Sequence, residues 1–148
     1  MITADTNVFV YLWDSGAPEK TRAARQLATA LGDRNSAIGL QVIGELQNVL
    51  RRKLKQPPWE AAQNARNLLT TFETFTASET NANEALTLMS AGRMSYWDAL
   101  LVTSARDAGC TAFLTEDMAD GMRLGALEII NPFGSDGLSD RALALLKL

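Results

Sequence analysis

The chain has 148 residues, of which 47% are hydrophobic and 21% are charged, and its net charge is −3. These values are typical of one globular domain, over residues 1–148, and exclude a disordered chain. No apolar run approaches the ~18 residues of a membrane-spanning helix. The first strand-like segment begins at Ile2, which leaves no room for a signal peptide, and a lone cysteine excludes a disulfide framework, so we expect a cytoplasmic protein.

Apolar residues recur with helix or strand periodicity along the whole chain, and no internal repeat or interdomain linker interrupts them. The spacing predicts strands over residues 2–4, 36–40, 72–77, 111–115 and 127–130, and helices over residues 18–32, 41–54, 58–69, 80–89, 95–108 and 139–147. Pro18 and Pro58 suit first helical positions, and Thr80 is placed to cap the helix that follows it. Alternation of this kind predicts an α/β fold: a three-layer α/β/α sandwich around a mostly parallel sheet of about five strands.

The helix over residues 41–54 carries an acid on its apolar side. Val42, Leu46, Val49 and Leu50 trace the stripe, which continues to Lys53 or Leu54. Glu45 lies on the same stripe, where an acid is costly unless something satisfies it. Two interpretations stay open: Glu45 reaches water from the edge of the stripe, or it points into a site.

The helix after Ser95 places a second acid at a helix start. Ser95 and Asp98 have the spacing of a capping box, and Gly109 supplies the left-handed stop. Trp97, Leu100, Leu101, Ser104, Ala105 and Ala108 form the stripe that we expect to face the core. Asp98 is therefore fixed in the first turn, where the helix dipole favours a carboxylate. A capping role alone would explain it, unless other acids can reach the same place.

The absence of histidine narrows the possible chemistry. It removes histidine-based acid–base catalysis, the common nucleophilic triads and the usual zinc sites. An enzyme with this composition must use carboxylates, most naturally with a hard divalent metal. The net negative charge argues against a nonspecific nucleic-acid-binding protein. It does not exclude a nuclease, because the carboxylates of a metal site contribute negative charge until the ion binds.

Four acids can meet at one edge of the predicted sheet: Asp5 after the first strand, Glu45, Asp98, and Asp117 after the fourth strand. Two carboxylates ~5 Å apart repel by roughly 3 kcal/mol at an effective dielectric constant of ~20, so four of them require a cation. Mg²⁺ or Mn²⁺ suits an all-oxygen site. Asn7 and Thr115 are polar residues that can hold the carboxylates.

The motifs Asp5-Thr6-Asn7-Val8, Glu45-Leu46, Tyr96-Trp97-Asp98-Ala99 and Leu114-Thr115-Glu116-Asp117 occur in the order and spacing of the four acidic motifs of the PIN domain, and the resemblance covers the whole chain. Within that family the sequence is most similar to the VapC-type toxins of bacterial toxin–antitoxin pairs. The segments Asp117 to Gly121 and Ile130 to Phe133 resemble one subgroup of them.

The resemblance implies a Mg²⁺- or Mn²⁺-dependent endoribonuclease in which Asp5, Glu45, Asp98 and Asp117 bind the metal, with Asn7 and Thr115 as supporting residues. Glu116 and Asp120 compete for the fourth position. We expect a metal-activated water to hydrolyse single-stranded or looped RNA into a 5′-phosphate and a 3′-hydroxyl. The resemblance also implies a cognate antitoxin that blocks the site and a homodimeric assembly.

Several residues have both a structural and an RNA-binding interpretation. The basic residues Arg51, Arg52, Lys55 and Arg93 could contact phosphate, although a basic last turn also suits the helix dipole. The aromatic residues Trp13, Trp59 and Tyr96 could stack on bases, although core packing explains them equally simply.

Three rival interpretations are weaker. A haloacid-dehalogenase-type phosphohydrolase expects Asp-x-Asp after the first strand, where this chain has Asn7. A phosphoacceptor receiver domain needs an aspartate after the middle strand, and the segment 75–78 has none. A catalytically inactive PIN fold that serves as an interaction module is at odds with the presence of all four acids.

Overall fold

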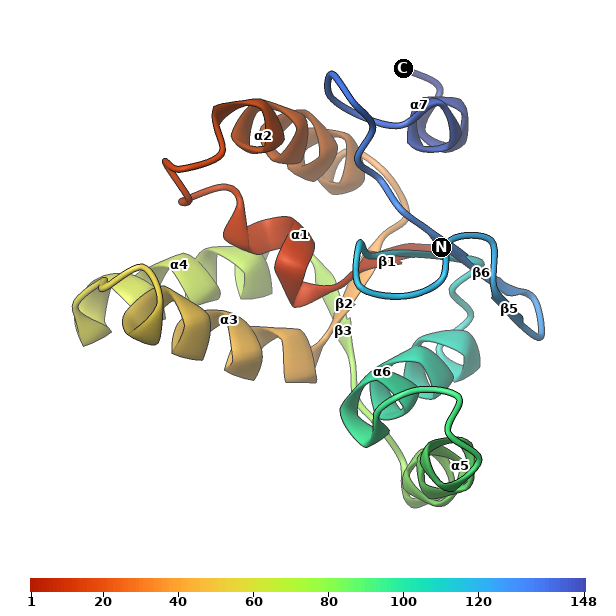
Figure 1. Cartoon of the computed structure of the whole chain (residues 1–148). Coiled ribbons are helices and arrows are strands. Elements are labelled where there is room, and N and C mark those ends of the chain that lie inside the picture. Colours follow the sequence, from red (N-terminus) through yellow and green to blue (C-terminus); the bar gives the residue numbers. More distant parts are fainter.

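The structure, a computed structural model, describes all 148 residues, and strands alternate with helices along the chain (Figure 1). The elements in chain order are β1 (Ile2–Ala4), α1 (Thr6–Val10), α2 (Pro18–Gly32), β2 (Ala37–Gly39), α3 (Leu40–Arg52), α4 (Pro58–Thr71), β3 (Glu73–Phe75), α5 (Glu79–Ser90), α6 (Tyr96–Asp107), β4 (Ala112–Leu114), β5 (Arg123–Leu124), β6 (Leu127–Ile130) and α7 (Asp140–Leu146). All five predicted strands are present. The short helix α1 and strand β5 are additional to the prediction.

The strands form two sheets. Four of them lie in the order β1-β4-β6-β5, in which β1, β4 and β6 are parallel and β5 runs antiparallel to β6. The other two, β2 and β3, form a parallel pair. A single parallel bridge between Ile2 and Ser36 connects the pair to β1. The prediction of a mostly parallel sheet is therefore confirmed, with a weak joint between β1 and β2.

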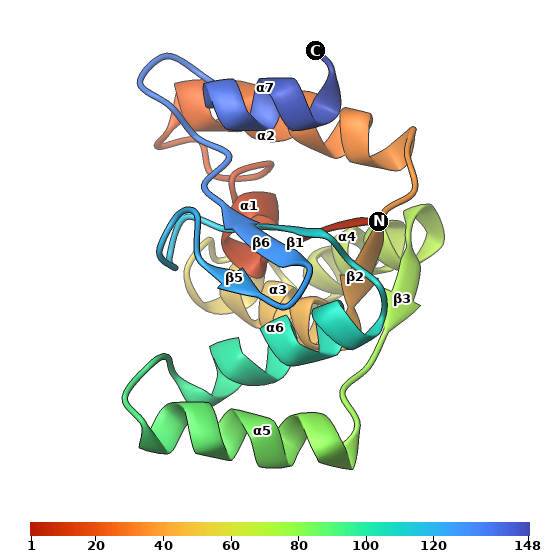
Figure 2. The same cartoon turned by 90° about the vertical axis from the view of Figure 1, so that its right-hand side faces the viewer.

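Helices cover both faces of the sheet. Figures 1 and 2 show α2 and α7 on one face and α5 and α6 on the other. Helices α3 and α4 lie side by side near α1, on the side where β1 and β2 end. A core of 25 buried residues extends from Ala4 to Leu146 and includes Phe113, Leu114 and Ile129 of the central strands. No helix is both long and apolar enough to cross a membrane.

The start of α5 corrects one predicted cap. Ser78, not Thr80, is the capping residue: its hydroxyl accepts a hydrogen bond from the Asn81 amide at 3.1 Å. The Asn81 side chain accepts one from the Ser78 amide at 2.9 Å, which completes a capping box. Thr80 lies inside the helix that this reciprocal pair starts.

The start of α6 combines a confirmed cap with a wrong burial prediction. Ser95 accepts a hydrogen bond from the Asp98 amide at 3.2 Å, and Gly109 adopts a φ of +92°, as predicted. Trp97, however, is 62% exposed. Helix α6 lies between the sheet and α5 (Figure 2), and its buried residues fall between Ala99 and Ala105, so Trp97 precedes the buried part of the helix.

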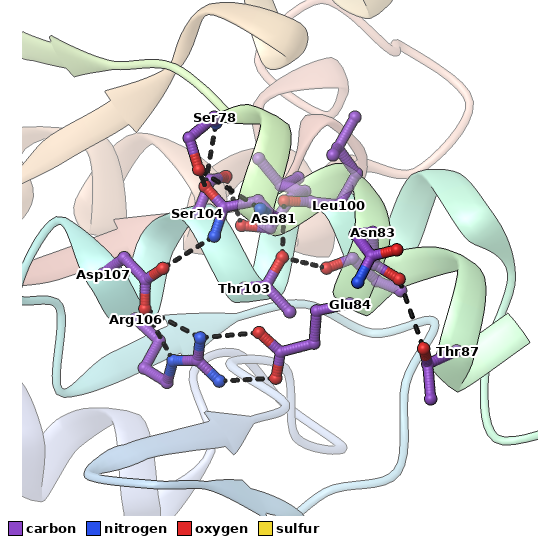
Figure 3. Close-up of polar contacts among 12 residues, drawn as sticks. Ser78, Asn81, Asn83, Glu84, Thr87, Leu100, Thr103, Ser104, Arg106 and Asp107 are labelled. Carbon is purple, nitrogen blue, oxygen red and sulfur yellow. Dashed lines mark hydrogen bonds and ion pairs between the residues drawn. The ribbon is translucent and has the colours of Figure 1, made fainter.

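A connected network of polar side chains joins α5 to α6 (Figure 3). Arg106 donates two hydrogen bonds to the Glu84 carboxylate, at 2.8 and 2.7 Å, and a third to Asp107 at 2.8 Å. Asp107 also accepts a hydrogen bond from Asn81 at 2.7 Å. Each acid in this interface therefore has a cationic partner.

Candidate active site

A cavity of about 530 Å³ opens beside α1, α3 and the first turn of α6. All four predicted acids line it, together with Asn7. They come from four separate segments: Asp5 follows β1, Glu45 lies on α3, Asp98 opens α6 and Asp117 follows β4. The fold thus brings together carboxylates that are up to 112 positions apart in the sequence.

Asp5 is the most buried of these acids, at 7% exposure. It caps α1: its Oδ1 accepts a hydrogen bond from the Thr6 amide at 2.7 Å, and its Oδ2 accepts one from the Thr115 hydroxyl at 3.0 Å. Burial raises its pKa to about 6, against the lowering effect of these two hydrogen bonds, and the nearby Glu45 and Asp98 carboxylates raise it further. Asp5 therefore carries its charge in an environment that disfavours charge.

Asn7 and Thr115, the two predicted supporting residues, connect Asp5 to Asp117 by hydrogen bonds. The Asn7 Nδ2 group lies 3.3 Å from Asp5 Oδ2, 3.0 Å from Thr115 Oγ1 and 2.8 Å from Asp117 Oδ2. The Asp117 amide donates to Thr115 Oγ1 at 3.2 Å. The Asn7 Oδ1 atom is buried and has no hydrogen-bond partner. One amide group thus fixes two carboxylates, and its own oxygen remains available.

Glu45 is held by two neighbours that the sequence analysis missed. The Thr6 hydroxyl donates to Glu45 Oε2 at 2.7 Å, and the Gln41 amide donates to Glu45 Oε1 at 2.7 Å. The same Gln41 nitrogen also donates to the Trp97 carbonyl, at 3.1 Å, and so joins α3 to the first turn of α6. Gln41 lies one helical turn before Glu45, a spacing that could have identified it.

Asp98 is half-buried in the first turn of α6. Desolvation raises its pKa most, and Glu45 and Asp117 raise it further, whereas a hydrogen bond with Ser95 lowers it. No ion pair involves Asp5, Glu45, Asp98 or Asp117. The four charges therefore repel one another without a compensating side chain in contact.

The two competitors for the fourth acidic position have other partners. Glu116 also lines the cavity, but it forms an ion pair with Lys20 at 2.6 Å and accepts a hydrogen bond from the Tyr11 hydroxyl. Asp120 lies outside the cavity lining and accepts hydrogen bonds from the Asn131 amide at 2.9 Å and from Arg141 at 2.5 Å. These contacts lower the pKa of Asp120. Among the three acids, only Asp117 is bound by Asn7.

The predicted basic and aromatic residues are not part of the cavity lining. Lys53 is the only cationic side chain there, although the helix periodicity had assigned it or Leu54 to the buried stripe. Trp59 is 73% exposed on α4, whereas Trp13 packs against the core. Tyr96 stacks edge-on against Trp97, with ring centroids 5.1 Å apart.

The donor atoms of the cavity suit a hard divalent ion. They are carboxylate oxygens, supplemented by the partnerless Asn7 Oδ1, and they include no sulfur or imidazole. In this structure, no three acidic side chains lie close enough to one another to bind one ion jointly. The chemistry of the residues therefore fits such an ion, and its binding requires the side chains to converge.

Comparison with known proteins gives a consistent result. A family model described as the PIN domain matches residues 2–119. A search of curated proteins finds no significant match. The fold is similar to that of Mycobacterium tuberculosis VapC20, a toxin described as cleaving the sarcin–ricin loop, with a TM-score of 0.63 and 19% identity over 82% of this chain and 91% of that one.

Two further solved structures resemble this chain over most of their length. A toxin–antitoxin complex from Klebsiella pneumoniae has a TM-score of 0.65 and 20% identity over 90% of this chain and 98% of that one. VapBC2 from Rickettsia felis, bound to a DNA fragment from its promoter, has a TM-score of 0.60 and 18% identity over 87% and 97% of the two chains. At these identities the similarity establishes a shared fold.

Proposed function

This chain belongs to the PIN-domain family, and on that premise we propose that it is a Mg²⁺- or Mn²⁺-dependent endoribonuclease, the toxin of a toxin–antitoxin pair. The observation that carries the proposal is the convergence of Asp5, Glu45, Asp98 and Asp117 on one cavity without a cationic partner in contact. Four such charges are costly in a partly buried site, so their presence indicates a function that needs them.

The protein's own residues organise the site. Thr6 and Thr115 hold Asp5 as a carboxylate, Gln41 and Thr6 orient Glu45, and Asn7 fixes Asp117. A divalent ion bound by these acids would act as a Lewis acid that activates water and neutralises charge on the phosphate. Hydrolysis would leave a 5′-phosphate and a 3′-hydroxyl. The chain has no histidine for covalent catalysis. Its one thiol, Cys110, is not reactive, because it is buried and burial raises its pKa to about 11.

The proposed substrate is RNA in a single-stranded or looped form, because splayed nucleotides can enter an open cavity more readily than a duplex can. The similarity to a toxin that cleaves an RNA loop supports this class of substrate. The proposed inhibitor is a cognate antitoxin, as in the complexes of similar fold. A basic side chain of that partner would complement the unpaired carboxylates, and we also propose that the protein is a homodimer.

The decisive experiment is cleavage of a labelled RNA pool by the purified protein with Mg²⁺, with Mn²⁺ and with EDTA. We expect cleavage that requires the metal. The variants Asp117→Asn and Glu116→Gln are matched neighbours: the first should reduce cleavage by about 100-fold or more, and the second by less than about 10-fold.

Cleavage that persists in EDTA would contradict the proposal. Equal losses in the two variants would remove the distinction between Asp117 and Glu116. If the folded protein binds Mn²⁺ but cleaves no RNA, the interaction-module interpretation would replace the enzymatic one.

A further inference from the structure

We propose that the same cavity contains a second, anion-binding subsite, formed by Lys53 and Asn48 of α3, that holds an RNA phosphate next to the one that is cleaved. The inference rests on the proposed ribonuclease function, because that function supplies the polyanionic ligand. It assigns a role to two residues that line the cavity but lie outside the acidic cluster.

The size of the cavity leaves room for more than a metal ion. A water molecule occupies about 30 Å³ in the liquid, so an octahedral ion with six oxygen ligands needs roughly 200 Å³. The cavity measures about 530 Å³. More than half of it is therefore available to the substrate.

Helix α3 contributes both acidic and basic side chains to the cavity wall. Glu45, Asn48, Val49 and Lys53 all line the cavity, and their spacing of i, i+3, i+4 and i+8 places them along one side of the helix. At a rise of 1.5 Å per residue, Lys53 lies about 12 Å along the axis from Glu45. An RNA strand that follows α3 would thus meet Glu45 first, then the Asn48 amide about 4.5 Å along the axis, and the Lys53 cation at the other end.

Lys53 is the free cation of this wall. It forms no ion pair and no side-chain hydrogen bond, although Asp14 and several other acids share its cavity. The helix dipole favours a basic residue at the end of α3, but it acts equally on Arg51 and Arg52, and neither of these lines the cavity. The dipole therefore explains the basic turn, and an anionic ligand explains why the exposed Lys53 borders the cavity without an acidic partner.

Binding can be tested separately from cleavage with a fluorescein-labelled, nuclease-resistant 2′-O-methyl oligoribonucleotide of ten residues, measured by anisotropy in Mg²⁺. We expect Lys53→Gln to weaken binding by about 10-fold and to reduce the salt slope by about 0.7, the value for one phosphate contact on a single strand. Arg52→Gln makes the same change of net charge on the adjacent residue and should weaken binding by less than about 2-fold. Lys53→Arg should bind like the wild type.

Cleavage assays provide the second readout. Lys53→Gln should raise KM for the RNA by about 10-fold and leave kcat within about 2-fold, because the phosphate that it holds is not the reacting one. Equal effects of the Lys53 and Arg52 variants would overturn the subsite in favour of general surface charge, and so would failure of the wild type to bind the oligonucleotide. If the oligonucleotide binds in a Lys53-dependent manner but no RNA is cleaved, the subsite stands and the nuclease function fails. If RNA is cleaved and Lys53→Gln binds like the wild type, only the subsite fails.

Discussion

The α5–α6 interface and the acidic cavity shift the pKa values of their carboxyl groups in opposite directions. In the interface, hydrogen bonds from Arg106 lower the pKa values of Glu84 and Asp107, so both acids are more stable as anions there (Figure 3). In the cavity, burial raises the pKa values of Asp5 and Asp98 and no side-chain cation compensates. The interface contributes to folding, whereas the cavity holds charge at a cost to folding. Such local conflicts are typical of functional sites.

Two aspartates of α6, Asp98 and Asp107, test this contrast most directly. Asp98→Asn should reduce RNA cleavage by about three orders of magnitude, because it removes a proposed metal-binding carboxylate. Its free energy of unfolding should change by less than about 1 kcal/mol, since relief of repulsion offsets the lost interaction with the helix dipole. Single-turnover kinetics and urea unfolding measure the two effects.

Asp107→Asn is the matched control and should behave in the opposite way. It weakens the contacts of Asp107 with Arg106 and Asn81, so it should destabilise the fold by about 1 kcal/mol and leave the activity per folded molecule unchanged. A loss of activity in Asp107→Asn without unfolding would show that the interface also serves the reaction.

The next effect in size concerns the interface itself. Arg106→Gln removes three charge-assisted hydrogen bonds in a partly buried position, and we expect a loss of about 2 kcal/mol in the free energy of unfolding. Arg123→Gln breaks a pair in which Arg123 is 65% exposed, and should cost less than about 0.5 kcal/mol. Equal losses in the two variants, measured by urea denaturation, would refute the structural role of the network.

Gln41 tests whether the cavity depends on its uncharged donors. Gln41→Leu removes the link from Glu45 to the Trp97 carbonyl, and we expect a loss of about 10-fold in both Mn²⁺ affinity and kcat/KM. Gln47→Leu, on the same helix, removes only hydrogen bonds within α3, one to the Gly44 carbonyl and one from Arg51, and should leave both quantities unchanged. Titration calorimetry with Mn²⁺ reads the effect without turnover, and unaltered Mn²⁺ affinity in Gln41→Leu would exclude this role.

The smallest effect is a pH dependence of stability in EDTA. The folded-state pKa of Asp5, about 6, lies above its ordinary value of 3.8, so the folded chain binds the proton more tightly and stability falls as pH rises through this range. Between pH 5 and pH 7 the loss should be about 1 kcal/mol. Asp98 acts in the same direction, whereas the contributions of Glu84 and Asp107 disappear only at more acidic pH. Asp5→Asn should flatten the slope, and an equally steep slope in that variant would assign the titration to another group.

Local sequence signals predicted the strand order in the chain, the helix starts at Pro18 and Ser95, and the stop at Gly109, because each depends on residues close in sequence. They failed where tertiary packing decides. The exposure of Trp97 depends on where along α6 the buried part of the helix begins, and the position of Lys53 depends on what α1 and α3 enclose.

The candidate site followed the same rule. That four acids share one cavity could be inferred from strand topology and family resemblance, since each acid follows a predicted strand or lies on a predicted helix. Among the partners of those acids, Asn7 and Thr115 could be named as candidates, but contacts that depend on how distant segments pack could not. The contacts of Gln41 with Trp97 and of Glu116 with Lys20 join residues 56 and 96 positions apart, and nothing in either local sequence announces them.

The single bridge between Ile2 and Ser36 has a mechanical consequence. Asp5 and Asp117 follow strands of the four-stranded sheet, and Glu45 lies on the helix that follows β2, so the carboxylates are carried by two sheets that one β-bridge connects. A ligand that contacts acids of both sheets links the two sheets and resists their sliding past each other. Its binding also adds to the free energy of unfolding. The protein would then be stiffest when its site is filled, whether by substrate or by inhibitor.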